Sequence, residues 1–305
     1  MYIFIVNPNA RSGLGHQIWK SLEVILKEKQ IEYKSYYTKY QTHATRLTKE
    51  ITSEVDECTL VVLGGDGTIN EVVNGITDFS KVTLGYIPIG SSNDFARSLK
   101  LSTDAETALS NILNPSRYMD LNIGKVSYKN KTRRFAVSAG IGFDAGVCHE
   151  IVVSKLKVFF NKIHLGKLSY VAVTLRQLAT QTPGALTVIL DDEKKIEFKK
   201  AYFATAMNNK YEGGGFKFCP KAEPDDDILD IIVAADIPKL KVLALLPTAY
   251  KGWHVHVKGI YTYQCKKAEF ISEKALPLHT DGEPVFLQRQ MCTTLEPEKV
   301  RLILS

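Results

Sequence analysis

Short apolar segments alternate with segments of helical spacing over roughly the first 110 residues, and this alternation constrains the fold most strongly. The apolar segments have the length of buried strands, and several of them end at Asn, Pro or Gly. Strands are expected at 2–6, 31–37, 59–63 and 83–89, and helices at 16–28, 42–55 and 69–76. This order predicts a parallel, doubly wound sheet covered by helices on both faces.

Three distinctive loops follow predicted strands, at residues 7–15, 64–68 and 88–94. Their sequences are NPNARSGLG, GGDGT and PIGSSND. Because strand–helix–strand connections are right-handed, loops that leave the carboxyl ends of parallel strands gather along one edge of the sheet. The pattern therefore predicts a ligand site at that edge.

The first of these loops has the composition of an anion site. Ser12, Gly13 and Gly15 precede a predicted helix, whose backbone N–H groups and dipole attract an anion, and Arg11 adds positive charge. The spacing of a P-loop is absent, and GGDGT does not match G-x-G-x-x-G. Taken alone, each loop is more typical of an ordinary strand-to-helix turn.

Asp66 in the second loop indicates what kind of anion fits. A carboxylate repels a polyphosphate unless a cation lies between them. Mg²⁺ is commonly held by one or two carboxylates together with substrate phosphates, so the loop predicts a magnesium nucleotide with Thr68 as a hydrogen-bond donor. The alternative is that Asp66 caps the helix beginning near Ile69, and the two roles are compatible.

Strand-like alternation dominates the chain after about residue 121. Residues 187–198 predict a hairpin that turns at 191–193. We expect an antiparallel β-sandwich, with the helical spacing of 151–179 as an inserted segment. The predicted domains are an α/β nucleotide-binding domain at 1–120 and a β-sandwich acceptor domain at 121–289.

Charge, cysteine content and hydropathy bound the setting in which the protein works. A net charge of +6 and a pI near 8.9 are too weak to indicate a nucleic-acid partner, and suit an anionic membrane surface or an anionic substrate equally well. The five cysteines are scattered without a C-x-x-C pair, which indicates a reducing compartment. No segment approaches the roughly 20 apolar residues of a membrane span, and the start lacks the features of a signal peptide. We expect a cytoplasmic protein with peripheral contact to the inner face of the membrane.

The three loops belong to longer motifs that resemble a known family. NPNARSGLG, GGDGTINEVVNGI and PIGSSNDFAR resemble blocks of the diacylglycerol kinase catalytic family, most closely the bacterial soluble, YegS-like lipid kinases related to sphingosine and ceramide kinases. Residues 138–147, 207–231 and 280–284 follow in the family's order and spacing, so the resemblance spans nearly the whole chain. GGDGT alone is less specific, because NAD kinases and 6-phosphofructokinases share it.

The resemblance implies where the ligands lie. It places the active site in a cleft between the two domains, returns the last strand, at 290–305, to the first domain, and implies ATP and Mg²⁺ as ligands. Asp66 and Asp94 are expected to join Asp281 in a water-bridged magnesium network. The expected nucleotide-binding residues are Asn9, Ala10, Arg11, Ser12, Gly13, Thr42, Gly64, Gly65, Asp66, Gly67, Thr68, Ile69, Asn70 and Ser91, the last of which is often threonine in the family.

The late motif TDGEP is the candidate chemical centre. A kinase that acts on an alcohol needs a base for the hydroxyl proton. By resemblance, Glu283 matches that general base and Asp281 its acidic companion. The alternative for the motif alone is a plain Asp-Gly turn before Pro284.

A second metal site is implied at AEPDDDILD. The resemblance matches Glu223, Asp226 and Ile228 to a structural magnesium site, with backbone carbonyls supplied by Glu223 and Ile228. The chain departs from the family at Asp227, where glycine is usual, and glycine often marks a positive φ. A solvated acidic turn is the alternative.

Two further patterns are expected to be structural. Residues 253–257 are interpreted as a strand that places His254 and His256 on one exposed face, and a metal site is disfavoured because no third ligand is in view. Residues 151–168 combine lysines with Phe159 and Phe160, and a buried helix is favoured over docking on an anionic bilayer.

The expected function is ATP-dependent phosphorylation of a lipid hydroxyl, with diacylglycerol as the acceptor and phosphatidic acid as the product, in phospholipid biosynthesis. One alternative is a kinase for a soluble acceptor, such as NAD. Another is a non-catalytic regulator that binds nucleotide or lipid. The expected partner is a lipid at the membrane surface, with a homodimer as a further possibility.

Overall fold

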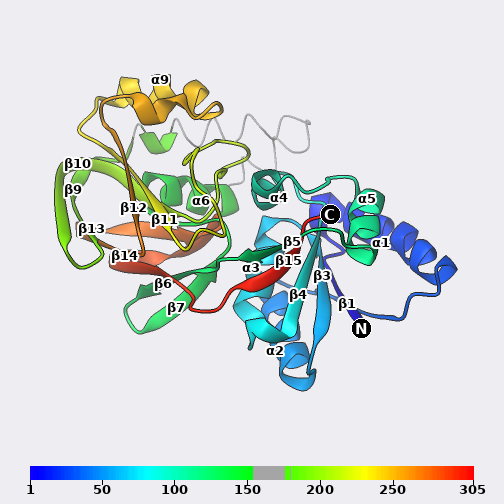
Figure 1. Cartoon of the computed structure of the whole chain (residues 1–305). Helices are drawn as coiled ribbons and strands as arrows, with labels where there is room; N and C mark the ends of the chain where they lie inside the picture. The colour runs from blue at the N-terminus through cyan, green and yellow to red at the C-terminus, as the bar shows by residue number, and fades with distance from the viewer. Residues whose placement is uncertain (154–175, 179) are drawn as a thin grey trace.

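The computed structural model describes residues 1–153, 176–178 and 180–305, and within them the chain forms two sheets that lie beside each other (Figure 1). The inserted helical segment expected at 151–179 and the lysine-rich stretch 151–168 fall mostly on residues 154–175 and 179, outside the described part. Residues 151–153 lie in the described part and form the end of helix α6 (Phe143–Val153).

The first sheet has six strands in the order β2-β1-β3-β4-β15-β5. Its parallel strands from the N-terminal part of the chain are β1 (Tyr2–Val6), β2 (Tyr33–Tyr37), β3 (Cys58–Gly64) and β4 (Val82–Pro88). The last strand of the chain, β15 (Val300–Ile303), lies parallel to β4, and β5 (Tyr118–Leu121) pairs antiparallel with β15. The predicted doubly wound sheet is therefore confirmed.

Helices cover both faces of this sheet because side chains along a strand alternate between the faces. The helices are α1 (Ala10–Glu28), α2 (His43–Glu54), α3 (Asp66–Gly75), η1 (Phe79–Lys81), α4 (Asp94–Leu99) and α5 (Ala105–Leu113). Ile3 and Ile5 pack in one buried cluster with residues of α2 and α3. Phe4 and Val6 pack in the opposite cluster with residues of α1 and α5. We call this unit the N-terminal domain.

The second sheet has nine antiparallel strands, and with its helices it forms the C-terminal domain. The strands are β6 (Gly124–Tyr128), β7 (Lys131–Phe135), β8 (Ser138–Gly142), β9 (Gly184–Leu190), β10 (Lys194–Met207), β11 (Leu229–Ala235), β12 (Ile260–Cys265), β13 (Lys267–Thr280) and β14 (Glu283–Leu295). The long strands β10, β13 and β14 are paired in part with different neighbours along their length, and β9 bridges β10 and β13. The predicted antiparallel β-domain is confirmed, and so is the hairpin at 191–193.

One expectation about the C-terminal domain was wrong, and one of its helices was not predicted. Residues 253–257 do not form a strand, because a short 3-10 helix, η2 (Trp253–His256), buries His254 and leaves His256 exposed. His254 is fixed by a hydrogen bond between its Nε2 and the carbonyl oxygen of Phe218. The sequence also gave no indication of helix α9 (Lys239–Ala249), which lies at the outer end of this domain (Figure 1).

None of the helices in the described part of the chain is both long and apolar enough to cross a membrane.

Candidate active site

A cavity of about 400 Å³ opens at the carboxyl ends of four neighbouring parallel strands. The loops that follow β1, β2, β3 and β4 all contribute to its wall, and Glu283 at the start of β14 reaches it from the C-terminal domain. The lining residues are Asn7, Asn9, Ala10, Arg11, Thr38, Lys39, Tyr40, Gln41, Gly65, Gly67, Thr68, Glu71, Gly90 and Glu283. The convergence predicted for the loops at 7–15, 64–68 and 88–94 is thus observed at this edge of the sheet.

Glycines let the loops after β3 and β4 touch each other and admit Glu283. A Cβ atom on Gly90 would lie 2.6 Å from the Cα atom of Gly65. A Cβ atom on Gly67 would lie 2.8 Å from Oε1 of Glu283. Both separations are shorter than a normal contact, so a side chain at these positions would push the loops or the carboxylate apart.

The loop after β1 is tied to the loop after β3. The amide nitrogen Nδ2 of Asn7 donates a hydrogen bond to Oγ1 of Thr68 over 3.0 Å. The backbone N–H of Asn9 donates to Oδ1 of Asn7, and α1 begins at the next residue. The positive dipole end of this helix borders the cavity, which suits an anionic group.

Asp94 is buried and Asp66 is partly buried, and the two residues lie beside each other behind the glycine loops. The two carboxylate oxygens of Asp66 accept hydrogen bonds from the backbone N–H groups of Asp94 and Phe95, so Asp66 caps α4. The alternative expectation, that Asp66 caps the helix beginning near Ile69, differs from this arrangement, because Asp66 is itself the first residue of α3. Burial, followed by the charge of Asp94, raises the pKa of Asp66 to about 7.

Asp94 is also largely engaged by the protein. Its Oδ2 accepts a hydrogen bond from the backbone N–H of Gly214 over 2.7 Å, and Arg97 lies 3.7 Å from its Oδ1. Burial raises its pKa as well. A divalent cation would stabilise the ionised forms of two close carboxylates. A carboxylate pair with raised pKa values is therefore a candidate cation site.

Asp281 lies at the tip of the hairpin between β13 and β14, where the chain turns through two left-handed residues. The φ angle is 49° at Asp281 and 78° at Gly282. Its carboxylate accepts four hydrogen bonds of 2.7 to 2.9 Å. The donors are the side-chain amide of Asn70 and the backbone N–H groups of Ala136, Val137 and Ser138. Burial raises the pKa of Asp281, and the four donors oppose that rise because they favour the ionised carboxylate. These bonds join the turn to α3 and to the β7–β8 connection.

Glu283 follows this turn and faces the cavity. Its Oε2 accepts a hydrogen bond from Nε2 of Gln41 over 3.0 Å. Burial raises the pKa of Glu283, and the charge of Arg133 opposes that rise. A carboxylate with a raised pKa that is still reachable from a cavity is suited to accept a proton.

A buried cluster of Asp144, Glu212 and His279 lies beneath the turn. Within the described part of the chain, their potential metal-ligand atoms lie within 4.8 Å of one another. Nε2 of His279 is 3.2 Å from Oδ2 of Asp144 and 3.2 Å from Oε1 of Glu212. Its other nitrogen, Nδ1, accepts a hydrogen bond from the backbone N–H of Gly282 over 3.1 Å.

The hydrogen bonds of His279 favour a polar network over a metal centre. Since Nδ1 accepts a bond, the proton of the neutral ring lies on Nε2 and points at the two carboxylates. A metal on Nε2 would displace that proton and leave the ring without an N–H group. Against the effect of burial, the charges of Glu212 and Asp144 raise the pKa of His279, so the proton on Nε2 is held between the ring and these carboxylates. Burial raises the pKa of Glu212 to about 7, and a protonated Glu212 removes one negative charge beside His279. The ring then stays neutral, so its Nδ1 can accept the bond from Gly282.

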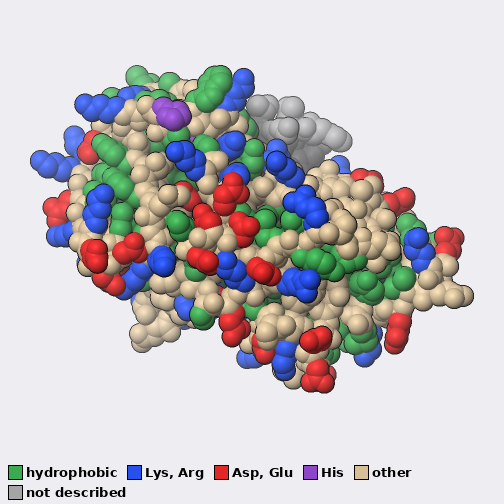
Figure 2. Space-filling view, viewed as in Figure 1, with side chains coloured by type: hydrophobic (Ala, Val, Ile, Leu, Met, Phe, Trp, Pro, Cys, Tyr) green, Lys and Arg blue, Asp and Glu red, His purple; other side chains and the backbone are tan. Residues whose placement is uncertain are grey.

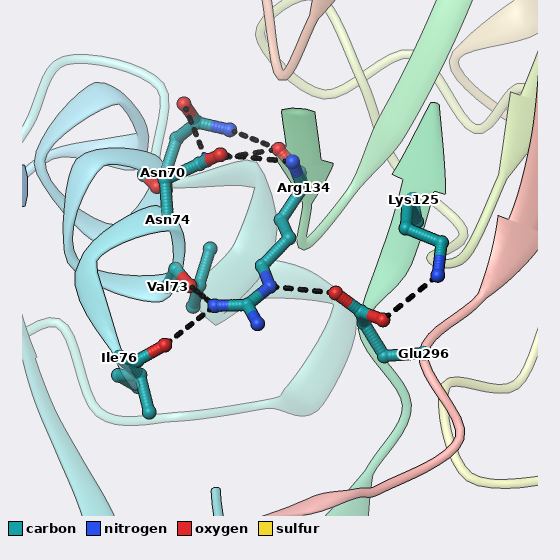
Figure 3. A network of polar contacts seen from close by, with 7 residues as sticks. All are labelled: Asn70, Val73, Asn74, Ile76, Lys125, Arg134 and Glu296. Atoms are coloured by element: carbon teal, nitrogen blue, oxygen red, sulfur yellow. Dashed lines mark hydrogen bonds and ion pairs between the residues drawn. The ribbon is translucent and has the colours of Figure 1, made fainter. Parts of the chain in front are cut away.

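Arg134 of β7 connects the C-terminal domain to the end of α3 (Figure 3). Its guanidinium donates hydrogen bonds to the carbonyl oxygens of Val73 and Ile76, over 3.1 and 2.6 Å. The same group pairs with Glu296 at 2.8 Å, and Lys125 pairs with Glu296 at 3.1 Å. These bonds satisfy carbonyl groups that the end of a helix otherwise leaves open.

The structure divides the residues expected to bind nucleotide into two groups. Asn9, Ala10, Arg11, Gly65, Gly67 and Thr68 line the cavity. Among the described side chains, Gly13, Thr42, Gly64, Asp66, Ile69, Asn70 and Ser91 are not part of its wall, and the side chain of Ser12 lies outside the described part. Ile69 and Asn70 face the interior of the protein, and Ser91 is exposed. The backbone N–H of Thr42 donates to Glu71 at the start of α2.

Several cavity residues were not singled out in the sequence. Thr38, Lys39, Tyr40 and Gln41 follow β2, and Glu71 lies one turn into α3. The rule that selected the other loops also applies to the loop after the predicted strand at 31–37. That loop contains no glycine, and so it lacked the signal that marked the others.

The second predicted metal site has a defined local structure. Oδ1 of Asp226 accepts a hydrogen bond from the backbone N–H of Ile228, and Lys210 pairs with Glu223. Asp227 adopts a φ of 63°, in the region that glycine occupies easily. Its side chain is held by Asn122 and Lys299, which offsets the strain of this conformation. Magnesium binding at 223–228 stays a prediction.

The α/β domain with its glycine loops meets the antiparallel β-domain at this cavity, and the β-domain supplies a carboxylate to the cavity wall. The model of the diacylglycerol kinase catalytic domain matches residues 1–126, and that of the YegS C-terminal NAD kinase beta sandwich-like domain matches residues 137–304. The chain belongs to the diacylglycerol kinase catalytic family.

Relatives of known sequence agree with this assignment. The chain is 32% identical over 288 residues to a Bacillus subtilis protein named "Putative lipid kinase YtlR", covering 92% of this chain and 93% of the relative. It is 30% identical over 281 residues to a diacylglycerol kinase of Staphylococcus carnosus, covering 92% of this chain and 87% of the relative.

Solved structures show the same fold. A protein described as "a putative diacylglycerol kinase" from Bacillus anthracis superposes with a TM-score of 0.78 at 24% identity, covering 100% of this chain and 97% of that one. An NAD kinase from Archaeoglobus fulgidus in complex with ATP superposes with a TM-score of 0.55 at 14% identity, covering 99% and 93%.

Proposed function

We propose that this protein transfers the γ-phosphoryl group of ATP to a lipid hydroxyl, with diacylglycerol as the acceptor and phosphatidic acid as the product. The observation that carries the proposal is the position of Glu283. A carboxylate with a raised pKa, from the C-terminal domain, reaches the cavity that the glycine loops of the N-terminal domain form. The membership in the diacylglycerol kinase family and the named relatives support the choice of reaction class.

The nucleotide would occupy the cavity at the carboxyl ends of the parallel strands. Backbone N–H groups at the start of α1 and of α3 suit its phosphates. Gly65, Gly67 and Gly90 have no side chains, so the phosphates can approach the backbone of the loops closely. Arg11 and Lys39 add positive charge to the wall. These groups position the donor and neutralise part of its charge.

Magnesium fits the carboxylates behind these loops. Asp66 has a pKa of about 7 because it is partly buried beside Asp94, and a cation would relieve the cost of ionising this pair. When bound, Mg²⁺ would draw charge from the phosphate oxygens of the donor. Asp281 differs from the pair, because four N–H donors already occupy its carboxylate.

Glu283 would act as the general base. The acceptor hydroxyl gives its proton to the Glu283 carboxylate, its oxygen forms a bond to the γ-phosphorus, and the bond from that phosphorus to the β–γ bridging oxygen breaks. ADP leaves with the electrons of the broken bond. Asp281 and His279 act as positioning residues, since both hold the turn that precedes Glu283.

Incubation of the protein with γ-labelled ATP, Mg²⁺ and a total-lipid extract in detergent micelles tests the proposal. We expect a labelled, chloroform-soluble product that migrates with phosphatidic acid. Label in a different lipid would keep the lipid kinase but replace the acceptor. Label in a water-soluble product would indicate a soluble acceptor, and no transfer despite nucleotide binding would indicate a non-catalytic regulator.

A further inference from the structure

Helix α9 carries apolar side chains on its outward face. Leu240 and Leu243, with exposed fractions of 80% and 36%, lie three residues apart, and the exposed Ala244 and Pro247 continue the same stripe. The opposite face is apolar too, because Val242 packs in the core of the C-terminal domain. A helix at the surface of a water-soluble domain normally turns polar residues outward, so this stripe calls for a partner.

Two aromatic rings extend the stripe beyond the end of the helix. Tyr250 is 54% exposed and Trp253 is 59% exposed. Tyr250 stacks on Phe216 with ring centres 4.2 Å apart, and the ammonium group of Lys251 lies 4.8 Å from the centre of the Trp253 ring. Exposed Tyr and Trp rings beside an apolar surface are typical of groups that sit at a membrane–water boundary.

The charged side chains of the segment that carries this stripe have one sign. Residues 237–260 contain four lysines and two histidines, and no Asp or Glu. Figure 2 shows hydrophobic side chains over α9, at the top of the molecule, flanked by blue Lys and Arg side chains, while most of the red acidic side chains lie lower. This combination is complementary to a surface that is apolar inside and negative outside.

We propose that α9 and η2 form the surface by which this protein docks on an anionic lipid bilayer, with Leu240, Leu243, Tyr250 and Trp253 entering the interface and Lys251 and Lys258 facing the headgroups. Such docking rests on the proposed function, because a lipid kinase must take its acceptor from a bilayer. A second copy of the chain fits less well, because two such surfaces would bring their lysines together.

Tryptophan fluorescence reads this surface directly. The chain has two tryptophans, of which Trp19 is fully buried in the N-terminal domain and Trp253 is exposed. Vesicles of phosphatidylcholine mixed with phosphatidylglycerol should therefore shift the emission of Trp253 to the blue and shield it from acrylamide. Vesicles of phosphatidylcholine alone should give a smaller effect, and added salt should reverse part of the binding. An emission spectrum unchanged by either kind of vesicle would overturn the proposal.

Variants of the full-length protein separate the apolar from the electrostatic part. Leu240→Ser should weaken partition into mixed vesicles by about tenfold. Lys258→Gln should weaken it by about fivefold and leave binding to neutral vesicles unchanged. Val24→Ser and Lys49→Gln are matched exposed changes on the N-terminal domain, and neither should affect partition. Equal losses in the α9 variants and in these controls would overturn the proposal.

The oligomeric state and the activity complete the test. Light scattering should give the same mass for the wild type and Leu240→Ser, whereas a dimer that Leu240→Ser dissociates would show that the stripe is an interface between copies. Leu240→Ser should raise the KM for acceptor presented in mixed vesicles and leave turnover of a dispersed short-chain acceptor unchanged. Docking without any kinase activity would refute the proposed function and leave the docking surface in place.

Discussion

Replacing Arg134 by methionine should destabilise the protein strongly, because Arg134 links the two domains through several buried groups. Its side chain is 24% exposed and that of its partner Glu296 is 13% exposed. The change would leave the Glu296 carboxylate with Lys125 alone and would remove the donors for the carbonyl groups of Val73 and Ile76. Breaking one partner from a largely buried ion pair typically costs about 3–5 kcal/mol, and we expect a loss of this size.

Urea unfolding followed by tryptophan emission measures this loss, with Trp19 in the N-terminal domain and Trp253 in the C-terminal domain. Lys125→Met is the matched control, since it removes the more exposed partner of Glu296 and should cost about 1 kcal/mol or less. Adding Glu296→Gln to Arg134→Met should recover part of the loss, because the unpaired carboxylate is gone. A free energy of unfolding for Arg134→Met within about 1 kcal/mol of the wild type would refute this reasoning.

Two further predictions concern the cavity itself. Gly67→Ala would place a Cβ atom 2.8 Å from Oε1 of Glu283, and the end of that flexible side chain would move aside. We expect turnover, measured by enzyme kinetics, to fall by about a hundredfold. The stability, measured by thermal unfolding, should change by less than about 1 kcal/mol. Turnover at the wild-type rate would contradict the position assigned to Glu283. Asp66 should make magnesium–nucleotide binding depend on pH, because its pKa is raised from 3.8 to about 7. The folded protein keeps this proton where the unfolded chain has lost it, so the Asp66 contribution to stability falls between those two pKa values as the pH rises. Nucleotide affinity, measured by titration calorimetry with Mg²⁺, should rise towards pH 7 and level off above it, and a flat profile would remove Asp66 from the cation site.

The N-terminal domain was largely predictable because its signals are local. Apolar strands, amphipathic helices and glycine loops each occupy a few consecutive residues, and the handedness of their connections brings the loops at 7–15 and 64–68 to one edge. The sequence could not explain why residue 67 is a glycine. The atom that needs the space there belongs to Glu283, which is far away in the chain.

The parts that could not be predicted depend on distant contacts or lack a periodic signal. The hydrogen-bond donors to Asp281 come from Asn70 and from residues 136–138, and the sequence around residue 281 does not predict these partners. Arg134 reaches α3 in the same way. Helix α9 was missed because it is apolar on both faces and contains Pro247, so neither a polar face nor an uninterrupted helical pattern marks it.

Glu283→Gln tests the central claim most directly, because it removes the base and keeps the size of the side chain. The measurement is the rate of transfer from γ-labelled ATP to diacylglycerol in mixed micelles, beside the nucleotide Kd of the same preparation. We predict that transfer falls by about a thousandfold or more while the nucleotide Kd stays within about twofold of the wild-type value. Transfer at the wild-type rate would show that the carboxylate in the cavity is not the base, and would contradict the mechanism built on it.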